Sequence, residues 1–286
     1  MGCFLYPVDI VQRFYEIHCH MQSEIDEFVG KRVVVTGAAS GIGAAIAARF
    51  TALGALVIGL DITEPPAKTC AETYQCDLSD SEQIARVCCE LKDPLFALYN
   101  VAGVPESRAA HEVMAVNVLG LRQLTEAIHP RLGDGGAVVN IASGAGAGWR
   151  ERLDSIVSLL DTPDFESGAA WCEAHPLSGP EAYNFSKEVV IVYSMRIAAR
   201  EFHRRVRVNS LSPGAVETPI LPDFYHTMDD VILERLREYS GGRHGEPEEI
   251  ASPAVFLASN AAGWINDTDL GVDGGAEVAL RLGEHA

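Results

Sequence analysis

The chain has 286 residues, of which 48% are hydrophobic, so it is long enough to bury the core of one large or two small domains. It carries 22 basic and 40 acidic residues, and the formal charge of −18 argues against nucleic acid or an anionic membrane surface as a partner. Seven cysteines without a C-x-x-C pair favour reduced thiols in a cytoplasm over disulfides or a zinc site.

Residues 1–30 form the least regular part of the sequence. They lack a basic segment and carry Asp9 within an apolar stretch, so they make a poor signal peptide. Met21 is an alternative start of the chain. We interpret residues 1–30 as an N-terminal extension of unclear role and residues 31–286 as one domain, because no repeat or linker divides them.

The first predicted element is a buried strand, because residues 33–36 read Val-Val-Val-Thr. Glycines and an alanine-rich helix follow it. Gly37 lets the chain turn tightly, Gly41 lets backbone approach a phosphate, and Gly43 lets the helix pack against the strand. The helix N-terminus then offers N–H groups to an anion. The candidate anion-binding residues are Gly37, Ser40, Gly41, Ile42 and Gly43. The spacing G-x-x-x-G-x-G also fits a purely structural turn.

Residues 55–61 predict a second buried strand that ends in Asp61, 24 positions after Gly37. This offset is close to the ~20 residues at which a carboxylate meets the ribose hydroxyls of a bound dinucleotide. No basic residue follows Asp61 directly to receive a 2′-phosphate, which favours NAD over NADP. The alternative is a solvated aspartate in a loop.

The next segments continue the alternation of strands and helices. A helix is predicted over residues 81–91 and an apolar strand over residues 95–99. Alternating strands and helices predict a parallel sheet, and such sheets bind ligands beyond the carboxyl ends of their strands. The residues at those ends are Gly37, Asp61, Asp77 and Asn100. Their convergence strengthens the case for a dinucleotide site.

The second half of the chain interrupts this alternation once. Between Ser143 and Tyr183 lie 39 residues, too many for a simple crossover, so we predict an inserted helical lobe at about residues 149–178. Its two helical segments are expected near residues 152–160 and 165–175. The other predicted elements are helices over 112–131, 182–203, 224–240 and 247–259, and strands over 137–142, 206–211 and 269–272.

Tyr183 and Lys187 lie four residues apart on a predicted helix, so their side chains share one face. A phenol with a reference pKa of ~10 becomes a base near neutrality only if its pKa falls by about 3, which corresponds to ~4 kcal/mol. An ammonium ~4 Å away supplies roughly that energy at an effective dielectric of ~20. The pair is therefore suited to proton transfer, although an exposed Tyr and a solvated Lys also occur at this spacing.

Two further polar residues add to this pair. Ser143 follows a strand end, where its hydroxyl can hold an alcohol or carbonyl oxygen near the phenol or simply cap a turn. Asn117 lies within a predicted helix, where asparagine is unfavourable unless its amide orders a water or bends the helix. The four residues together indicate acid/base chemistry on an oxygen-bearing substrate.

In combination, these motifs resemble those of the short-chain dehydrogenase/reductase family from about residue 31 to the end. The matching segments are Thr36-Gly37-x-x-x-Gly41-x-Gly43, Asn100-Val101-Ala102-Gly103, Asn117, Ser143, Tyr183-x-x-x-Lys187 and Pro213-Gly214-x-x-x-Thr218. The resemblance implies a single Rossmann-like α/β domain with a doubly wound, mostly parallel seven-stranded sheet. It also implies an oxidoreductase that moves hydride between NAD and a carbinol carbon.

The resemblance also implies a role for each motif. Tyr183 is the acid/base, and Lys187 lowers the pKa of the phenol while it binds the nicotinamide ribose. Ser143 orients the substrate oxygen, and Asn117 holds a water for a proton relay. The implied cofactor-binding residues beyond the glycine turn and Asp61 are Asp77 and Leu78 beside the adenine, Asn100, Ala102 and Gly103 on the adenosine side, and Pro213, Gly214, Val216 and Thr218 towards the nicotinamide.

The long insertion is similar to that of bacterial 3α-hydroxysteroid dehydrogenase/carbonyl reductases and, more closely, coniferyl-alcohol dehydrogenases. This likeness implies an aromatic allylic or steroid-like alcohol as the small-molecule substrate. The candidate pocket walls are Ser143, Trp149, Phe224 and Tyr225. We expect the lobe either to cover the site with apolar surface and exclude water or to form a local core.

Two other functions stay open. An NADP-dependent reductase of ketones or acyl thioesters would use the same fold, and Asp61 argues against it. A non-catalytic NAD-sensing protein would not need Ser143, Tyr183 and Lys187. The family resemblance implies a homo-oligomer, either a dimer or a tetramer, and the insertion puts the usual tetramer interface in question.

Overall fold

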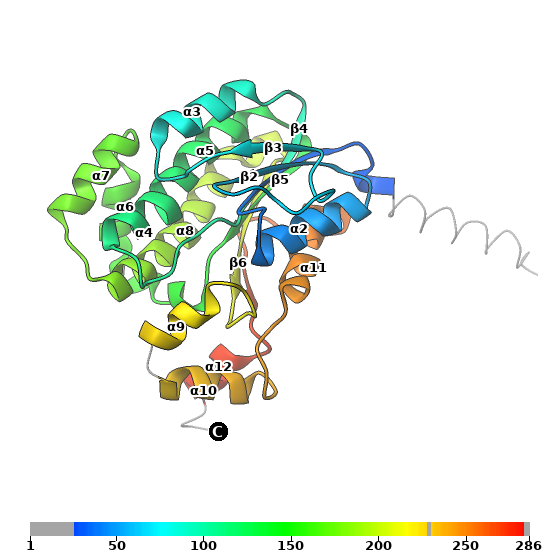
Figure 1. Cartoon of the computed structure of the whole chain (residues 1–286). Helices are drawn as coiled ribbons and strands as arrows, with labels where there is room; N and C mark the ends of the chain where they lie inside the picture. The colour runs from blue at the N-terminus through cyan, green and yellow to red at the C-terminus, as the bar shows by residue number, and fades with distance from the viewer. Residues whose placement is uncertain (1–25, 228–229, 283–286) are drawn as a thin grey trace, which may run out of the picture.

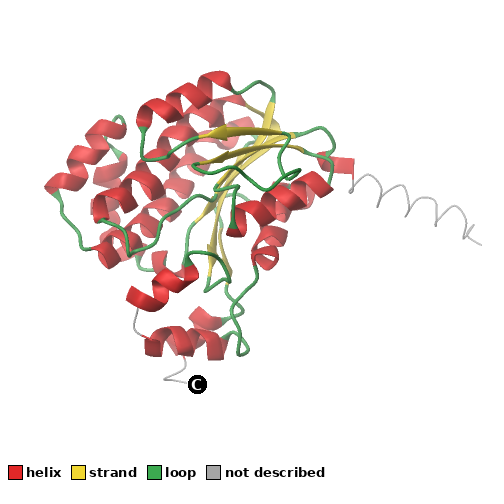
Figure 2. Cartoon of the chain, in the orientation of Figure 1, coloured by secondary structure: helices red, strands yellow, loops and turns green. Residues whose placement is uncertain are grey.

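The computed structural model describes residues 26–227 and 230–282, so residues 1–25 of the predicted extension, with Met21, lie outside the described residues. Within the described part, seven parallel strands form one sheet in the order β3-β2-β1-β4-β5-β6-β7. Figure 2 shows the strands at the centre with helices on both sides. The strands are β1 (Arg32–Thr36), β2 (Leu56–Asp61), β3 (Glu72–Gln75), β4 (Leu95–Asn100), β5 (Leu132–Ile141), β6 (Arg207–Pro213) and β7 (Asp269–Val272). The predicted Rossmann-like α/β fold is confirmed.

The β-branched run of β1 supplies apolar side chains to both faces of the sheet. Val33 and Val35 point into one core and Val34 into the other, and all three are fully buried. Full burial of such a side chain contributes ~1.5–3 kcal/mol, so this short strand stabilises both layers. Helices α2 (Gly41–Ala52) and α11 (Pro247–Ala258) cover the first face, and α3 (Ser81–Glu90), α5 (Leu121–Ile128) and α8 (Gly179–Glu201) cover the second (Figure 1).

Strand β3 at the edge of the sheet is absent from the sequence-based list of strands. Its residues alternate between half-buried and exposed, and none of them is fully buried. The sequence Glu-Thr-Tyr-Gln therefore lacks the apolar run that identifies the central strands. Backbone pairing with β2, as in Ile58 opposite Glu72, determines this strand instead.

The predicted helix over residues 112–131 is divided into several segments. It consists of α4 (Ala110–Met114), the π-helical segment η2 (Ala115–Gly120) and α5, followed by a short 3-10 turn at His129–Arg131. Asn117 lies within η2 and is almost completely buried. Single π-helical turns inside α-helices often occur at functional sites.

The predicted insertion contains α6 (Leu153–Leu160) and α7 (Phe165–Ala174), at the outer edge of the helical layer in Figure 1. Arg122 of α5 anchors it, because its guanidinium donates to the carbonyl oxygens of Leu159 and Asp164 at 3.2 and 2.6 Å. The Trp171 ring stacks on Phe185 of α8, with 6.0 Å between the ring centroids. The lobe therefore packs against α5 and α8 on the outside of the helical layer.

Three helices lie together near the carboxyl ends of β6 and β7, in the lower part of Figure 1. They are α9 (Leu221–Thr227), α10 (Asp230–Tyr239) and α12 (Ala276–Leu282).

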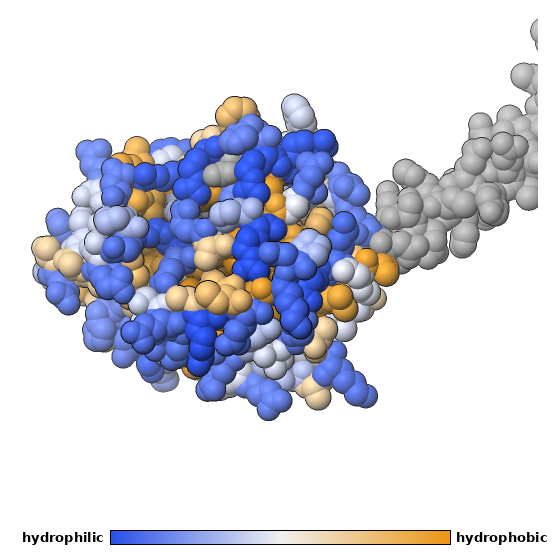
Figure 3. Space-filling view, turned by 90° about the horizontal axis from the view of Figure 1, so that it is seen from above, coloured by the Kyte–Doolittle hydropathy of each residue, from blue (hydrophilic) through white to orange (hydrophobic). Residues whose placement is uncertain are grey.

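The face seen from above in Figure 3 is mainly hydrophilic, with apolar residues in scattered patches. None of the helices in residues 26–227 and 230–282 has the length and apolar character needed to cross a bilayer.

Candidate active site

A cavity of about 970 Å³ opens at the carboxyl ends of the strands. Its walls include the ends of β2, β5 and β6, represented by Asp61, Ile141 and Pro213. Helices α9, α10 and α12 contribute the apolar residues Leu221, Phe224, Ile232, Leu233, Leu236 and Leu280. The position agrees with the expectation that open parallel sheets bind ligands at this edge.

The glycine turn after β1 approaches neighbouring backbone too closely for a side chain. A Cβ on Gly37 would lie 2.9 Å from the Ala102 backbone, and one on Gly43 would lie 2.0 Å from the Gly37 carbonyl oxygen. Gly37 and Gly41 also have positive φ angles of 66° and 53°. These positions therefore require glycine for packing, and they leave backbone open to the cavity.

The N-terminus of α2 fits a pyrophosphate. Its N-cap, Ser40, makes no side-chain capping hydrogen bond, so the first N–H groups of α2 have no capping acceptor from that side chain. Residues Gly37, Ser40, Gly41, Ile42 and Gly43 all line the cavity. Exposed amide groups and the positive end of the helix dipole suit an anion at this point.

Asp61 is at the end of β2 and lines the same cavity. Its carboxylate accepts hydrogen bonds from the backbone N–H groups of Ala39 and Thr63, each at 3.0 Å, and from the Thr63 hydroxyl at 3.1 Å. These contacts hold the acid beside the glycine turn. Asp77 and Leu78, after β3, also line the cavity.

The loop after β4 is joined to β1 by Thr36. The Thr36 hydroxyl accepts hydrogen bonds from the N–H groups of Val101 and Ala102, at 2.9 and 3.0 Å. Ala102 and Gly103 line the cavity, whereas Asn100 is not among the lining residues. The Asn100 amide instead donates to Thr125 and Asn140 in a buried polar network.

Ser143, Tyr183 and Lys187 all line the same cavity as the residues of the glycine turn. The Lys187 ammonium lies 5.7 Å from the centroid of the Tyr183 ring and donates to the Ile141 carbonyl oxygen at 3.1 Å. The helix that carries both residues begins with a capping box formed by Ser178 and Glu181. Pro213, Gly214, Val216 and Thr218 line the cavity as well.

Burial is the main cause of the pKa shifts of Tyr183 and Lys187. The pKa of Tyr183 is raised to about 12, chiefly by burial; the hydrogen bond with Ser143 lowers it, and the Glu106 carboxylate makes a smaller upward contribution. Burial also lowers the pKa of Lys187 to about 8. The expectation that the ammonium alone brings the phenol near neutrality therefore underestimated desolvation, which disfavours both charged forms.

Asn117 is not among the cavity-lining residues, although it lies beside them. Its side-chain oxygen accepts from the Val104 N–H at 2.8 Å, and its amide donates to the Val104 carbonyl at 3.1 Å and to the Ser186 hydroxyl at 3.2 Å. A Cβ on Gly103 would lie between Asn117 and Lys187, at 3.3 Å from the Asn117 oxygen and 3.7 Å from the Lys187 nitrogen. Asn117 thus fixes the loop that faces the lysine.

Only some of the residues predicted to form the pocket walls line the cavity. Phe224 lines the cavity and packs edge-on against Tyr183, with 5.2 Å between ring centroids. Trp149 is not a lining residue, and its ring packs against the Arg150 guanidinium at 4.2 Å. Among the described residues, none of those at positions 149–178 lines the cavity. The expectation that the lobe covers the site is therefore not supported.

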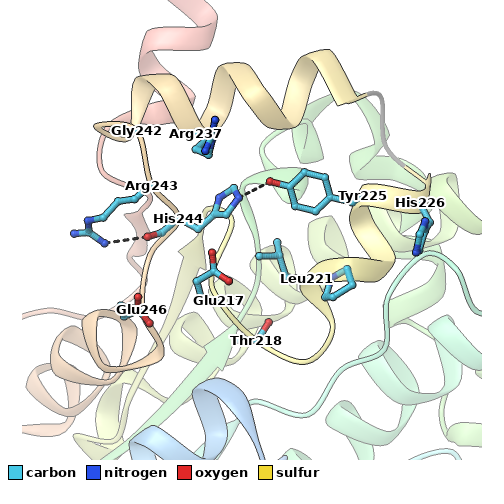
Figure 4. Close-up of a pocket in the computed structure, with 11 residues that line it drawn as sticks. Glu217, Thr218, Leu221, Tyr225, His226, Arg237, Gly242, Arg243, His244 and Glu246 are labelled. Atoms are coloured by element: carbon cyan, nitrogen blue, oxygen red, sulfur yellow. Dashed lines mark hydrogen bonds between the residues drawn. The ribbon is translucent and has the colours of Figure 1, made fainter.

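Tyr225 faces a smaller neighbouring pocket of about 620 Å³. Figure 4 shows its phenol directed at His244, to which it is hydrogen-bonded. Thr218 and Leu221 border both this pocket and the large cavity. Successive helical residues point about 100° apart, and here Phe224 lines the large cavity while Tyr225 lines the smaller pocket.

Sequence reasoning missed Val104 and Glu106, which lie in the loop after β4, and the cavity-lining residues of α10 and α12. The position of Glu106 in the loop that follows a strand end was the available signal. The leucines of α10 and α12 carry no such signal, because apolar helix residues usually indicate core.

Two family models match this chain. The model described as short chain dehydrogenase matches residues 31–152, and the one described as Enoyl-(Acyl carrier protein) reductase matches residues 172–277. The interval between the two matches includes α6 and most of α7. It therefore falls within the inserted lobe.

Individual relatives cover almost the whole domain. Coniferyl-alcohol dehydrogenase from Pseudomonas sp. strain HR199 is 37% identical over 251 residues, which cover 87% of this chain and 97% of the relative. The 3-alpha-hydroxysteroid dehydrogenase/carbonyl reductase of Comamonas testosteroni is 31% identical over 87% of this chain and 97% of its own length. The crystal structure of 3-alpha-hydroxysteroid dehydrogenase from Pseudomonas sp. B-0831 complexed with NADH superposes with a TM-score of 0.73 at 30% identity, covering 90% of this chain and 100% of that chain. The chain therefore belongs to the short-chain dehydrogenase/reductase family of oxidoreductases.

Proposed function

We propose that the protein is an NAD-dependent alcohol dehydrogenase that interconverts an alcohol and its aldehyde or ketone, with Tyr183 as the acid/base. The observation that carries this proposal is the convergence of Ser143, Tyr183 and Lys187 on one cavity that continues to the glycine turn. A dinucleotide seated on that turn would extend towards the phenol along the ends of the strands.

The chain's own residues account for the proton transfer. Bound NAD supplies a hydride acceptor at C4 of its nicotinamide and, when oxidised, a positive charge. Ser143 holds the substrate oxygen by its hydroxyl, and Tyr183 exchanges the hydroxyl proton at its phenolic oxygen. With a pKa of about 12 the phenol keeps its proton near neutrality, so it is ready to donate in the reducing direction. In the oxidising direction the positive charge of Lys187 favours release of that proton.

Asp61 supports NAD rather than NADP as the cofactor. Its carboxylate is held beside the glycine turn, where it would accept hydrogen bonds from the ribose hydroxyls and repel a 2′-phosphate. Asp77 and Leu78 would flank the adenine, and Val216 and Thr218 would contact the nicotinamide amide.

An apolar alcohol is the substrate class that best suits the cavity. Leu221, Phe224 and the leucines of α10 and α12 form its substrate side, next to Tyr183. The relatives named above act on coniferyl alcohol or hydroxysteroids, and both are large, mainly apolar alcohols. We propose an aromatic allylic alcohol as the first choice and a steroid-like alcohol as the second.

Absorbance of NADH at 340 nm tests this function. Purified protein is mixed with NAD or NADP and a panel of aromatic allylic, steroid and aliphatic alcohols. We expect NADH formation with at least one aromatic allylic or steroid alcohol. NAD and NADH binding without oxidation or reduction of any panel member would instead indicate the NAD-sensing alternative.

The assembly is proposed to be a homo-oligomer. The insertion occupies the outer side of α8, where Arg152 pairs with Glu188 at 2.7 Å and Trp171 stacks on Phe185. A second subunit would therefore meet a different surface there than in relatives without the insertion. Analytical ultracentrifugation of the whole chain distinguishes a dimer from a tetramer.

We also propose a cytoplasmic location. The five cysteines in the described part of the chain are free thiols, as expected for a reducing compartment. Burial raises the pKa of Cys76, Cys88 and Cys172 to about 11, which makes these thiols poorly reactive. Fractionation of the native host would test this location.

A further inference from the structure

Glu106 is a buried acid in the wall of the cavity. Its residue is 6% exposed, and its Oε1 atom has no hydrogen-bond donor among the described residues. It lines the same cavity as Ser143 and Tyr183, and none of the roles assigned above uses it. Because an unpaired buried carboxylate is costly, its position indicates a ligand group that donates a hydrogen bond to it.

The backbone holds Glu106 firmly beside the helix of the acid/base residue. A Cβ on Gly179, the first residue of α8, would lie 2.5 Å from the Glu106 carbonyl oxygen. The next residue, Ser107, donates a hydrogen bond to Asp223 of α9 at 3.2 Å. Glu106 is thus fixed between α8, which carries Tyr183, and α9, which carries Phe224.

The charged neighbours of Glu106 are already paired. Arg108 and Glu112 line the cavity too, but they form an ion pair with each other at 2.7 Å. Glu277, a further acid that lines the cavity, pairs with Arg281. The Glu106 carboxylate also raises the pKa of Tyr183, which places its charge within electrostatic reach of the phenol.

Besides these paired charges, the substrate side carries apolar side chains, among them Val104, Leu221 and Phe224. An apolar pocket with one fixed acceptor orients a ligand by a single donor group. A hydroxyl meets that requirement with one hydrogen bond, whereas an ammonium would leave further donors unpaired.

We propose that Glu106 accepts a hydrogen bond from a second hydroxyl of the substrate and thereby selects alcohols that carry a hydroxyl besides the reacting one. The inference rests on the proposed function for the identity of the reacting alcohol. It adds a specificity-determining residue and narrows the substrate class to hydroxyl-bearing, mainly apolar alcohols.

Matched substrates test this inference. Cinnamyl alcohols with a hydroxyl at ring position 2, 3 or 4 are compared with their methoxy counterparts, which cannot donate. For at least one position, the wild-type protein should prefer the hydroxyl by at least about tenfold in kcat/KM. Glu106→Leu should reduce that preference to about twofold or less, and Glu106→Gln should give an intermediate value. Glu112→Gln, at a paired acid of the same wall, should keep the preference.

Calorimetric binding of the same pairs to protein saturated with NADH separates this inference from the proposed function. A hydroxyl preference in binding that disappears in Glu106→Leu, without any turnover, supports the role of Glu106 and contradicts the dehydrogenase. Turnover or binding with no hydroxyl preference at any position overturns the role of Glu106. The melting temperature of Glu106→Leu should equal or exceed that of wild type, and a clear fall would show that Glu106 is structural instead.

Discussion

The ammonium of Lys187 donates a hydrogen bond to the carbonyl oxygen of Ile141, with 3.1 Å between the two atoms. This contact joins α8 to the end of β5 and fixes the lysine at the mouth of the sheet. The lysine is nevertheless almost fully buried, and its pKa falls to about 8 because burial disfavours its charge.

The buried Lys187 predicts a stability that rises with pH. Its pKa is about 8 in the folded protein and 10.5 as the ordinary value, so between these pH values the unfolded chain binds more protons. By linkage, the free energy of unfolding then increases with pH in this window, by about 2–3 kcal/mol relative to Lys187→Met. Urea titrations of both proteins from pH 7.5 to 10.5 measure the difference. A difference independent of pH would contradict the buried position of the ammonium.

The glycine turn predicts different results for two glycines with similar φ angles. Gly37 and Gly30 have φ of 66° and 71°, but only a Cβ on Gly37 would contact other backbone, at Ala102. Both alanine variants should lose about 1–2 kcal/mol of stability because of the left-handed backbone, and Gly37→Ala should lose more because its Cβ meets the Ala102 backbone. Only Gly37→Ala should also weaken NADH binding, by at least about tenfold, in a fluorescence titration. Equal NADH affinity in both variants would remove the turn from the cofactor site.

Asp61 predicts the cofactor preference. Asp61→Ala removes the carboxylate that would face the ribose of bound NAD, so the ratio of kcat/KM for NAD to that for NADP should fall by at least about tenfold. Asp61→Asn keeps one acceptor oxygen, which can serve the N–H group of Ala39 or of Thr63 but not both, and so controls in part for the shape of the turn. If initial rates show the wild-type ratio in Asp61→Ala, the acid does not contact the ribose.

Arg122 anchors the insertion, so we expect its substitution to change stability without changing catalysis. Arg122→Met removes the hydrogen bonds that the buried guanidinium donates to Leu159, Thr162 and Asp164 and should cost about 2–4 kcal/mol in urea unfolding. Arg196→Met removes only an exposed ion pair with Asp161 and should cost less than about 1 kcal/mol. Because the lobe does not line the cavity, kcat should stay within about threefold in both variants. A large loss of kcat in Arg122→Met at unchanged stability would assign the lobe to the active site.

The central strands and the glycine turn could be predicted from the sequence, because each depends on local residue types. A run such as Val33 to Val35 fits a strand covered on both faces, and Gly37 fits a turn that tolerates no Cβ. The edge strand β3 could not be identified in this way, because backbone pairing rather than apolar character places it. The π-helical turn at Asn117 also depends on tertiary structure, namely the hydrogen bonds to Val104.

Residues of the site that follow a strand end could be predicted from the sequence. Residues whose position depends on how helices pack could be predicted less well. Trp149 follows Ser143 closely in sequence, but the lobe that it begins packs outward against α8. Phe224 and Tyr225 are adjacent, and the helix turns them towards two different pockets. The pKa of Tyr183 depends on burial, which spacing along a helix does not reveal.

Oxidation of an alcohol by Tyr183→Phe, measured beside cofactor binding, tests the central claim most directly. The substitution removes only the phenolic oxygen and keeps the ring against Phe224. With an alcohol that the wild-type protein oxidises, kcat should fall by about 10²–10⁴-fold while the Kd for NADH stays within about twofold. Near-normal turnover in Tyr183→Phe would contradict the assignment of this tyrosine as the acid/base.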